Sequence, residues 1–273
     1  MAELRRMRPL LGTYVEVAAS GEQAEIGVRA AFDNLAASHA RWSFHDPDSE
    51  LSQLNAQPGS WVRLSAVSLR LLHLARGMTA ASGGRFNCTV GGTLVRRGQL
   101  PDHGPAPLIE CGDASDIELA AGAARLCRPV RVTLDGIAKG YAVDLTVRAL
   151  RRAGVSSGWV NAGGDLRVFG DANLPVQRRE ADGRMTPLGH VRNAALATSH
   201  GGPPSEAFPA SIVGAAVGAH TAPMAMWTVL ARTGWRADAL TKVAAAASQG
   251  TRKDWVARLG GHLVEPASER QAA

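Results

Sequence analysis

The sequence predicts an α+β fold in which a mixed, largely antiparallel sheet forms the core and helices flank it. Predicted strands adjoin one another in places and alternate with helices in others, which differs from a regular βαβ series. The stretch "GWVNAGGDLRVFG", residues 158–170, is typical of two short strands joined by a glycine turn. We expect a single domain over residues 1–265, followed by a disordered tail over residues 266–273.

The first half of the chain carries clear strand and helix signals. Residues 12–18 alternate like a strand, and apolar residues at helical spacing predict a helix over about 22–40. Asp46 as N-cap with Pro47 at the first helical position predicts a short helix there. An amphipathic helix is expected over residues 65–81.

The second half continues the same mixture. Residues 97–116 are rich in Pro, Gly and Asp and predict a loop. A strand is expected over 130–135, and a helix from about 137 to 153. The segments 227–234 and 236–248 predict a further strand and a further helix.

Composition excludes several classes of function. The net charge is +6, but the arginines are scattered and aromatic residues are few, so we expect no nucleic-acid partner. No run of about 18 apolar residues occurs, so stable membrane insertion is not expected. The N-terminus has no visible signal peptide or lipobox. The three cysteines lack metal-ligand spacing and favour a reduced, cytoplasmic protein.

Lys139, in "LDGIAKGYAVD" (residues 134–144), is one of only three lysines among 30 basic residues. It falls in the first turn of the expected helix, where the helix dipole makes a cation unfavourable by roughly 0.3–1 kcal/mol. A bound phosphate would remove this cost, because helix N-termini favour anions. An ordinary strand-to-helix turn with a solvated lysine explains the same residues.

A second candidate lies in "ADALTKV", residues 237–243. Asp238, Thr241 and Lys242 share one helix face because they are three and four residues apart. Carboxylate and hydroxyl oxygens suit Mg²⁺. A surface Asp–Lys ion pair is the alternative. Two glycine-rich stretches, residues 82–92 and 160–170, allow either close approach of a ligand or plain turns.

Seven segments together resemble the ApbE family, whose members are FAD:protein FMN transferases. They are, in chain order, "LLGTYVEV", "SFHDPDSELSQLN", "SGGRFNCTVGG", "LDGIAKGYAVD", "VNAGGDLRVFG", "ALATS" and "ADALTK". The resemblance runs from about residue 7 to 250.

The resemblance implies an enzyme that takes FAD as substrate together with Mg²⁺. Such enzymes attach FMN through a phosphoester to a threonine or serine of an acceptor flavoprotein, and AMP leaves. Two alternatives stay open, namely an FAD diphosphatase that forms FMN and AMP, and a non-catalytic FAD-binding protein on a degenerate scaffold.

The resemblance also implies a set of site residues. The expected flavin-nucleotide contacts are Leu11, His45, Arg85, Phe86, Asn87, Thr133 and Lys139. Gly136 falls where a backbone carbonyl reaches the metal, and Asp238 matches a metal-binding carboxylate. No catalytic residue is assigned.

Two departures from the family pattern bear on activity. The metal-binding threonine stands four residues after the aspartate in the family, and here that position holds Lys242. Thr241, one residue earlier, could replace the missing ligand, or the ammonium of Lys242 could take over part of the metal's charge. The family's H-x-x-D-P-x-T-G segment is not recognisable, and "ASIVGAAVGAH" stands in its place, with His220 as a candidate base.

Overall fold

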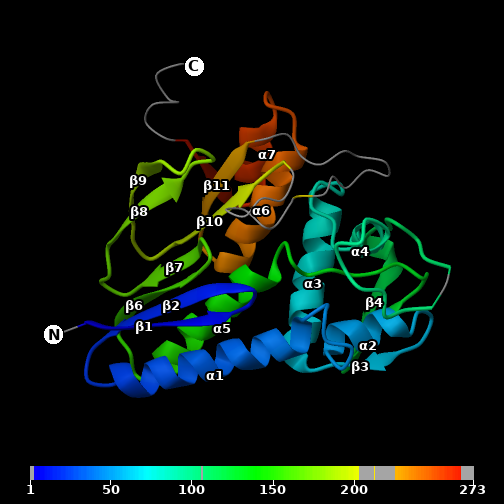
Figure 1. Ribbon diagram of the computed structural model, residues 1–273, viewed down its shortest axis with the longest axis horizontal. Coiled ribbons are helices and arrows are strands. Elements are labelled where there is room, and N and C mark those ends of the chain that lie inside the picture. Colours follow the sequence, from blue (N-terminus) through cyan, green and yellow to red (C-terminus); the bar gives the residue numbers. More distant parts are fainter. Residues whose placement is uncertain (1–2, 106, 203–211, 213–224, 266–273) are drawn as a thin grey trace. The chain divides into compact units, whose positions relative to one another are not determined.

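The computed structural model describes residues 3–105, 107–202, 212 and 225–265 (Figure 1). These residues form two compact units. The large-sheet unit comprises residues 3–36, 139–202, 212 and 225–265, and the small-sheet unit comprises 37–105 and 107–138. The architecture confirms the predicted α+β class. The tail expected over 266–273 lies outside the described residues.

The large-sheet unit is built on one seven-stranded sheet in which every neighbouring pair is antiparallel. In spatial order its strands are β1 (Glu3–Leu10), β2 (Thr13–Ser20), β6 (Ser157–Ala162), β7 (Asp165–Phe169), β10 (Ala195–His200), β11 (Met226–Ala231) and β12 (Gly261–Val264). A separate hairpin is made by β8 (Leu174–Arg179) and β9 (Met185–Val191). The largely antiparallel sheet expected from the sequence is therefore confirmed.

Four helices belong wholly or partly to this unit, namely α1 (Ala24–Trp42), α5 (Ala138–Arg152), α6 (Gly234–Ala246) and α7 (Arg252–Arg258). α6 packs on β10 and β11 (Figure 1), where Ala237 joins a buried cluster with Ala195, Ala197 and Ala231. Because alanine side chains are short, the helix backbone can lie close to the sheet. This close packing brings the side chains of α6 within reach of β10, where Lys242 donates to Ser199.

The small-sheet unit holds a three-stranded sheet in the order β3-β5-β4. Its elements are α2 (Glu50–Ala56), β3 (Val62–Arg63), α3 (Ala66–Ala81), α4 (Gly91–Arg96), the 3₁₀ helix η1 (Ala114–Asp116), β4 (Ile117–Ala120) and β5 (Ala123–Leu126). The short helix begins later than predicted from Asp46 and Pro47, because Ser49 is its N-cap and accepts from Ser52 N–H. Ser65 caps α3 in the same way, as the predicted boundary implied.

The strand predicted over residues 130–135 is wrong, because the segment makes only a short backbone pairing with residues 88–91 and a side chain, not a strand, bonds Val132. Only Arg131 makes a bridge, to Val90. Asn55 bonds both backbone groups of Val132, accepting from its N–H at 2.8 Å and donating to its carbonyl at 2.9 Å. The backbone is thus satisfied without a ladder of strand hydrogen bonds.

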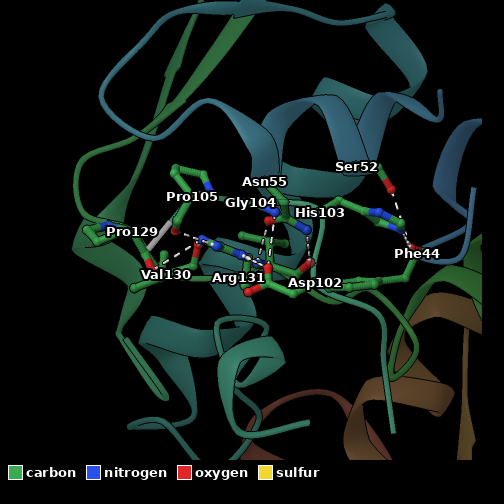
Figure 2. A network of polar contacts seen from close by, with 11 residues as sticks. Phe44, Ser52, Asn55, Asp102, His103, Gly104, Pro105, Pro129, Val130 and Arg131 are labelled. Atoms are coloured by element: carbon green, nitrogen blue, oxygen red, sulfur yellow. Dashed lines mark hydrogen bonds and ion pairs between the residues drawn. The ribbon is translucent and has the colours of Figure 1, made fainter. Parts of the chain in front are cut away.

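Arg131 organises this part of the small-sheet unit (Figure 2). Its side chain is fully buried, and its guanidinium donates to Asp102 Oδ1 at 3.0 Å and to Pro105 O at 2.9 Å. Gly104 lies directly against the guanidinium, since an added Cβ would come 2.2 Å from it. The loop predicted over 97–116 is therefore irregular but held in place, with η1 at its end.

Among residues 3–105, 107–202, 212 and 225–265, no helix has both the length and the apolar character to cross a bilayer. Cys88, Cys111 and Cys127 are all free thiols. Cys88 is buried, and burial raises the pKa of its thiol to about 11.

Candidate functional site

Two hairpin turns and the end of β10 meet at one end of the large sheet. β2 pairs with β6 so that Val15 lies opposite Ala162, which places the start of β2 beside the β6–β7 turn. The turn residues Gly163 and Gly164 have φ of 60° and 101°, as the predicted glycine turn requires. Gly163 leaves no room for a side chain, since an added Cβ would lie 2.4 Å from Thr13 Oγ1.

Lys139 and Asp165 meet at this end of the sheet. Lys139 lies in the first turn of α5, as predicted, and its side chain is 34% exposed. Asp165 begins β7 directly after the two turn glycines and is almost fully buried. The Lys139 ammonium is 3.8 Å from Asp165 Oδ2. A partly exposed ammonium is therefore fixed near the turn by a buried carboxylate.

The first turns of α5 and α6 are joined reciprocally by two aspartates. Asp144 of α5 accepts from Gly234 N–H at 2.8 Å and from Trp235 N–H at 3.0 Å, at the start of α6. Asp238 of α6 accepts from Gly140 N–H at 3.1 Å, in the first turn of α5. Carboxylates at helix N-termini are favourable in both respects, as hydrogen-bond acceptors and as charges opposite the dipole. Asp238 is thereby held close to the first turn of α5, where Lys139 lies.

The close approach of these helices depends on glycine. An added Cβ on Gly140 would lie 2.2 Å from the carbonyl oxygen of Gly234, and one on Gly234 would lie 2.4 Å from that of Gly140. Both glycines are therefore required by the packing, not by a positive φ. The glycine after the lysine in "LDGIAKGYAVD" is explained in this way.

Asp238, Thr241 and Lys242 share a face of α6, as their spacing predicted, and they converge on Ser199 of β10. The Lys242 ammonium lies 2.5 Å from Asp238 Oδ1, 3.1 Å from Ser199 Oγ and 3.3 Å from Asp238 O. Thr241 Oγ1 donates to Asp238 O at 2.7 Å and lies 2.7 Å from Ser199 Oγ. Asp238 is fully buried, so this is not the surface ion pair that the sequence left open.

Burial and charge act together on Asp165. Burial raises the pKa of its carboxyl to about 7, and the negative charge of Asp238 adds to the rise. Lys139 and Lys242 oppose that rise because their positive charges favour the carboxylate. The cluster thus holds two carboxyl groups and two ammonium groups, and the charges of the other three groups influence the pKa of Asp165.

The residues around Asp238 do not fit a bound Mg²⁺. One carboxylate oxygen accepts from Gly140 N–H, and the other already lies beside the Lys242 ammonium. The Thr241 hydroxyl donates to the carbonyl of its own helix. Within the described part of the chain, no three His, Cys, Asp or Glu side chains gather as metal ligands. A cation is present beside Asp238, but it belongs to a lysine.

The expected contacts Arg85, Phe86 and Asn87 lie in the small-sheet unit after α3. The Asn87 side chain donates to Gly112 O at 2.8 Å and accepts from Thr89 N–H at 2.9 Å. Phe86 is buried, and Arg85 donates to Ser82 O at 3.1 Å. These side chains are engaged inside the unit, so a ligand would meet this run mainly through its backbone.

His45, Thr133 and Gly136 lie in the same unit. His45 is exposed, and the preceding Phe44 carbonyl is fixed by His103 Nε2 at 3.1 Å and by Ser52 Oγ at 3.4 Å (Figure 2). Thr133 is buried, and its hydroxyl donates to Asp135 Oδ2 at 3.0 Å. Gly136 lies in the turn before α5. Their roles toward a ligand stay predictions.

Leu11 occupies the turn between β1 and β2 with a φ of 55°, followed by Gly12 at 69°. A leucine in the left-handed region is unfavourable by about 1–2 kcal/mol. Such strained backbone persists only where the surrounding structure maintains it, and it is found most often at functional sites. The positive φ of Leu11 is therefore a structural reason, separate from the family resemblance, to consider it a candidate site residue.

Sequence reasoning missed Asp165, Ser199 and Asp144 as members of the site. All three lie within segments already singled out, at "GGD", "ATS" and "AVD". A cavity of about 390 Å³ in the large-sheet unit contains none of the predicted residues, since its walls come mainly from β8, β11 and β12. The candidate base His220 lies outside the described residues.

Comparisons with known proteins agree with this fold. The crystal structure of the ApbE protein from Thermotoga maritima is 20% identical, covers 99% of both chains and gives a TM-score of 0.79. The apo form of the flavinyl transferase ApbE from Pseudomonas stutzeri is 19% identical, covers 99% of this chain and 96% of that chain, and gives 0.81. At these identities the likeness shows the fold alone.

A curated relative, named FAD:protein FMN transferase, from Rhodobacter capsulatus, is 29% identical over 180 residues, or 59% of this chain. The chain spans about a third (34%) of the length of that relative. The sequence pattern of the ApbE family matches residues 11–264. Because that match covers nearly the whole chain, the protein belongs to the ApbE family.

Proposed function

We propose that the protein is an FAD:protein FMN transferase that modifies a threonine or serine of an acceptor flavoprotein. The acceptor hydroxyl oxygen forms a bond to the phosphorus on the FMN side of the diphosphate. The bond between that phosphorus and the bridging oxygen breaks, and AMP leaves with the bridging oxygen. The hydroxyl proton is released, and we assign no residue as its acceptor. Membership of the ApbE family supports this proposal.

The observation that carries the proposal is the placement of Lys139. Its ammonium is partly exposed at the end of the large sheet, beside the Gly163–Gly164 turn and next to Asp165. The backbone contributes less than the sequence suggested, because Ala138 N–H bonds Leu134 O and Gly140 N–H bonds Asp238. The lysine would therefore supply most of the positive charge that this end offers to a diphosphate.

Several finer features are part of the proposal. The nucleotide contacts would come from Leu11 and Lys139, and from the small-sheet residues His45, Arg85, Phe86, Asn87 and Thr133. The resemblance also brings Mg²⁺ with ligands from Gly136, Asp238 and Thr241, but the contacts around Asp238 speak against that ion. The single domain over 1–265 and the cytoplasmic location stay predictions.

The test uses the purified full chain with FAD, with and without Mg²⁺ and with and without a threonine-bearing acceptor peptide. AMP is followed by chromatography and flavinylation by mass spectrometry. AMP formed only with acceptor, together with a flavinylated peptide, would establish transfer. AMP formed without acceptor would instead identify an FAD diphosphatase, and bound FAD without AMP would identify a binding protein.

Replacing Lys139 tests the proposed diphosphate contact. We expect Lys139→Gln to weaken FAD binding by about 10–100-fold, because one charge-assisted contact to phosphate contributes about 1.5–3 kcal/mol. Lys253→Gln is the control, since it removes an ammonium that pairs with Glu265 at 2.9 Å in a mostly exposed position. Equal FAD affinity in both variants, measured by flavin fluorescence, would exclude Lys139 from the site.

A further inference from the structure

We propose that the Lys242 ammonium is a built-in cation that replaces a divalent metal ion at Asp238, so that the site needs no Mg²⁺. The inference rests on the proposed function in one respect, namely that the diphosphate of FAD binds at this end of the sheet. It deepens that function because the charge that neutralises Asp238 comes from a side chain and not from a dissociable ion.

The ammonium is held by three oxygen acceptors, which matches its three hydrogens. They are Asp238 Oδ1, Asp238 O and Ser199 Oγ, at 2.5 Å, 3.3 Å and 3.1 Å. Two come from α6 itself, and the third comes from β10. An oxygen-lined position that accepts a cation is therefore already filled from within the chain.

The Asp238 carboxylate already has a hydrogen-bond donor at each of its oxygens. It is fully buried, and both of its oxygens have donors, Lys242 on one and Gly140 N–H on the other. A divalent ion at Oδ1 would have to displace the ammonium, and the displaced charge would stay close to the ion. Like charges at such a distance disfavour one another strongly in a buried setting.

Asp238 has its counter-charge without a metal, because the Lys242 ammonium lies beside its carboxylate. Asp165 and Asp238 contribute two carboxyl groups, and Lys139 and Lys242 contribute two ammonium groups. Lys242 neutralises Asp238, which in turn bonds the first turn of α5 where Lys139 lies. Lys242 is therefore a positioning residue that acts through Asp238, whereas Lys139 is the group offered to the ligand.

The experiment measures metal binding directly. Mn²⁺ is titrated into the full chain, with and without FAD, and free Mn²⁺ is read by electron paramagnetic resonance. We expect the natural protein to show no site at Asp238, so that its titration equals that of Asp238→Asn. Lys242→Thr, which places a hydroxyl four residues after Asp238, should gain a Mn²⁺ site whose affinity exceeds the background binding of the natural protein on the order of tenfold or more, because the competing charge is gone.

Three control variants keep the result specific. Lys253→Thr removes another paired ammonium from the same unit, at a largely exposed position, and should gain no site. The double variant Asp238→Asn/Lys242→Thr should lose the gained site. Because loss of Lys242 leaves a buried carboxylate without its counter-ion, Lys242→Arg is measured as well, and it should exclude Mn²⁺ as the natural protein does.

The outcomes separate this inference from the proposed function. Stoichiometric Mn²⁺ binding by the natural protein that Asp238→Asn removes would overturn the inference, with or without turnover. A Lys242→Thr variant that folds but gains no site would overturn it too. In contrast, a chain that releases no AMP from FAD under any condition refutes the transferase, while the Mn²⁺ titrations still decide the role of Lys242.

Discussion

The two units of the chain bury positive charge in contrasting ways. In the small-sheet unit, Arg131 is fully buried and its guanidinium donates to one carboxylate and several backbone carbonyls. In the large-sheet unit, Lys139 and Lys242 remain partly exposed, while their aspartate partners are buried. The cation is enclosed in the first network, and it faces outward in the second.

This difference separates structural from functional roles. A guanidinium surrounded by carbonyls satisfies loop backbone that has no sheet partner, and little of it is left for a ligand. An ammonium that is anchored on a buried carboxylate but partly exposed can still meet an anion. We therefore expect Arg131 to control stability, and the lysine cluster to control ligand binding and its dependence on pH and ions.

The largest expected effect is on stability in the small-sheet unit. Arg131→Met should lower the free energy of unfolding by about 3 kcal/mol, because it leaves several carbonyls and Asp102 without their donor. Urea denaturation followed by circular dichroism measures the loss. Arg96→Met is the control, since the Arg96–Glu110 pair is largely exposed and should contribute less than about 1 kcal/mol. Equal losses in the two variants would contradict the contrast between enclosed and exposed cations.

The next largest effect is the dependence of stability on pH that the Asp165 carboxyl confers. Its pKa in the folded protein is about 7, above its usual value of 3.8, owing to burial and the nearby charge of Asp238. Folding therefore favours the protonated carboxyl, and this contribution to stability is lost as pH rises through about 7. Lys139 and Lys242 oppose the rise in the pKa of Asp165, because their positive charges favour the carboxylate.

Asp165→Asn removes this titration. Relative to the variant, the natural protein should lose about 2 kcal/mol of stability between pH about 5 and about 8. Thermal unfolding over that range measures the difference. Asp171→Asn, at a position whose side chain is 99% exposed, should show no such trend. A natural protein that instead gains stability relative to Asp165→Asn with rising pH would show that the lysines dominate the cluster.

Local sequence patterns predicted much of the lysine and aspartate cluster in the large-sheet unit. Helical periodicity placed Lys139 in the first turn of α5, and the glycine pair predicted the β6–β7 hairpin. Spacing alone put Asp238 and Lys242 on one face. These features depend on neighbours within a few residues, which is the range over which such patterns carry information.

The rest depends on partners far away in the chain. The extended segment around Val132 is satisfied by Asn55, which lies 77 residues earlier, so its strand-like pattern misled. Ser199 meets Lys242 only because β10 packs on α6. The reciprocal bonds between Asp144 and Gly234, and between Asp238 and Gly140, likewise join positions 90 and 98 residues apart. No local rule specifies these pairings.

The smallest expected effect tests the strained β1–β2 turn, at the end of the large sheet where Lys139 lies. Leu11→Gly relieves a positive φ of 55°, and it should raise stability by up to about 1 kcal/mol, since the side chain is only partly buried. If the leucine side chain contacts the flavin as the family resemblance implies, the same change should weaken FAD binding severalfold. Thermal unfolding and flavin fluorescence measure the two quantities on one sample. A gain in stability without any loss of FAD affinity would show that the strain serves the hairpin alone, and it would exclude Leu11 from the proposed flavin contacts.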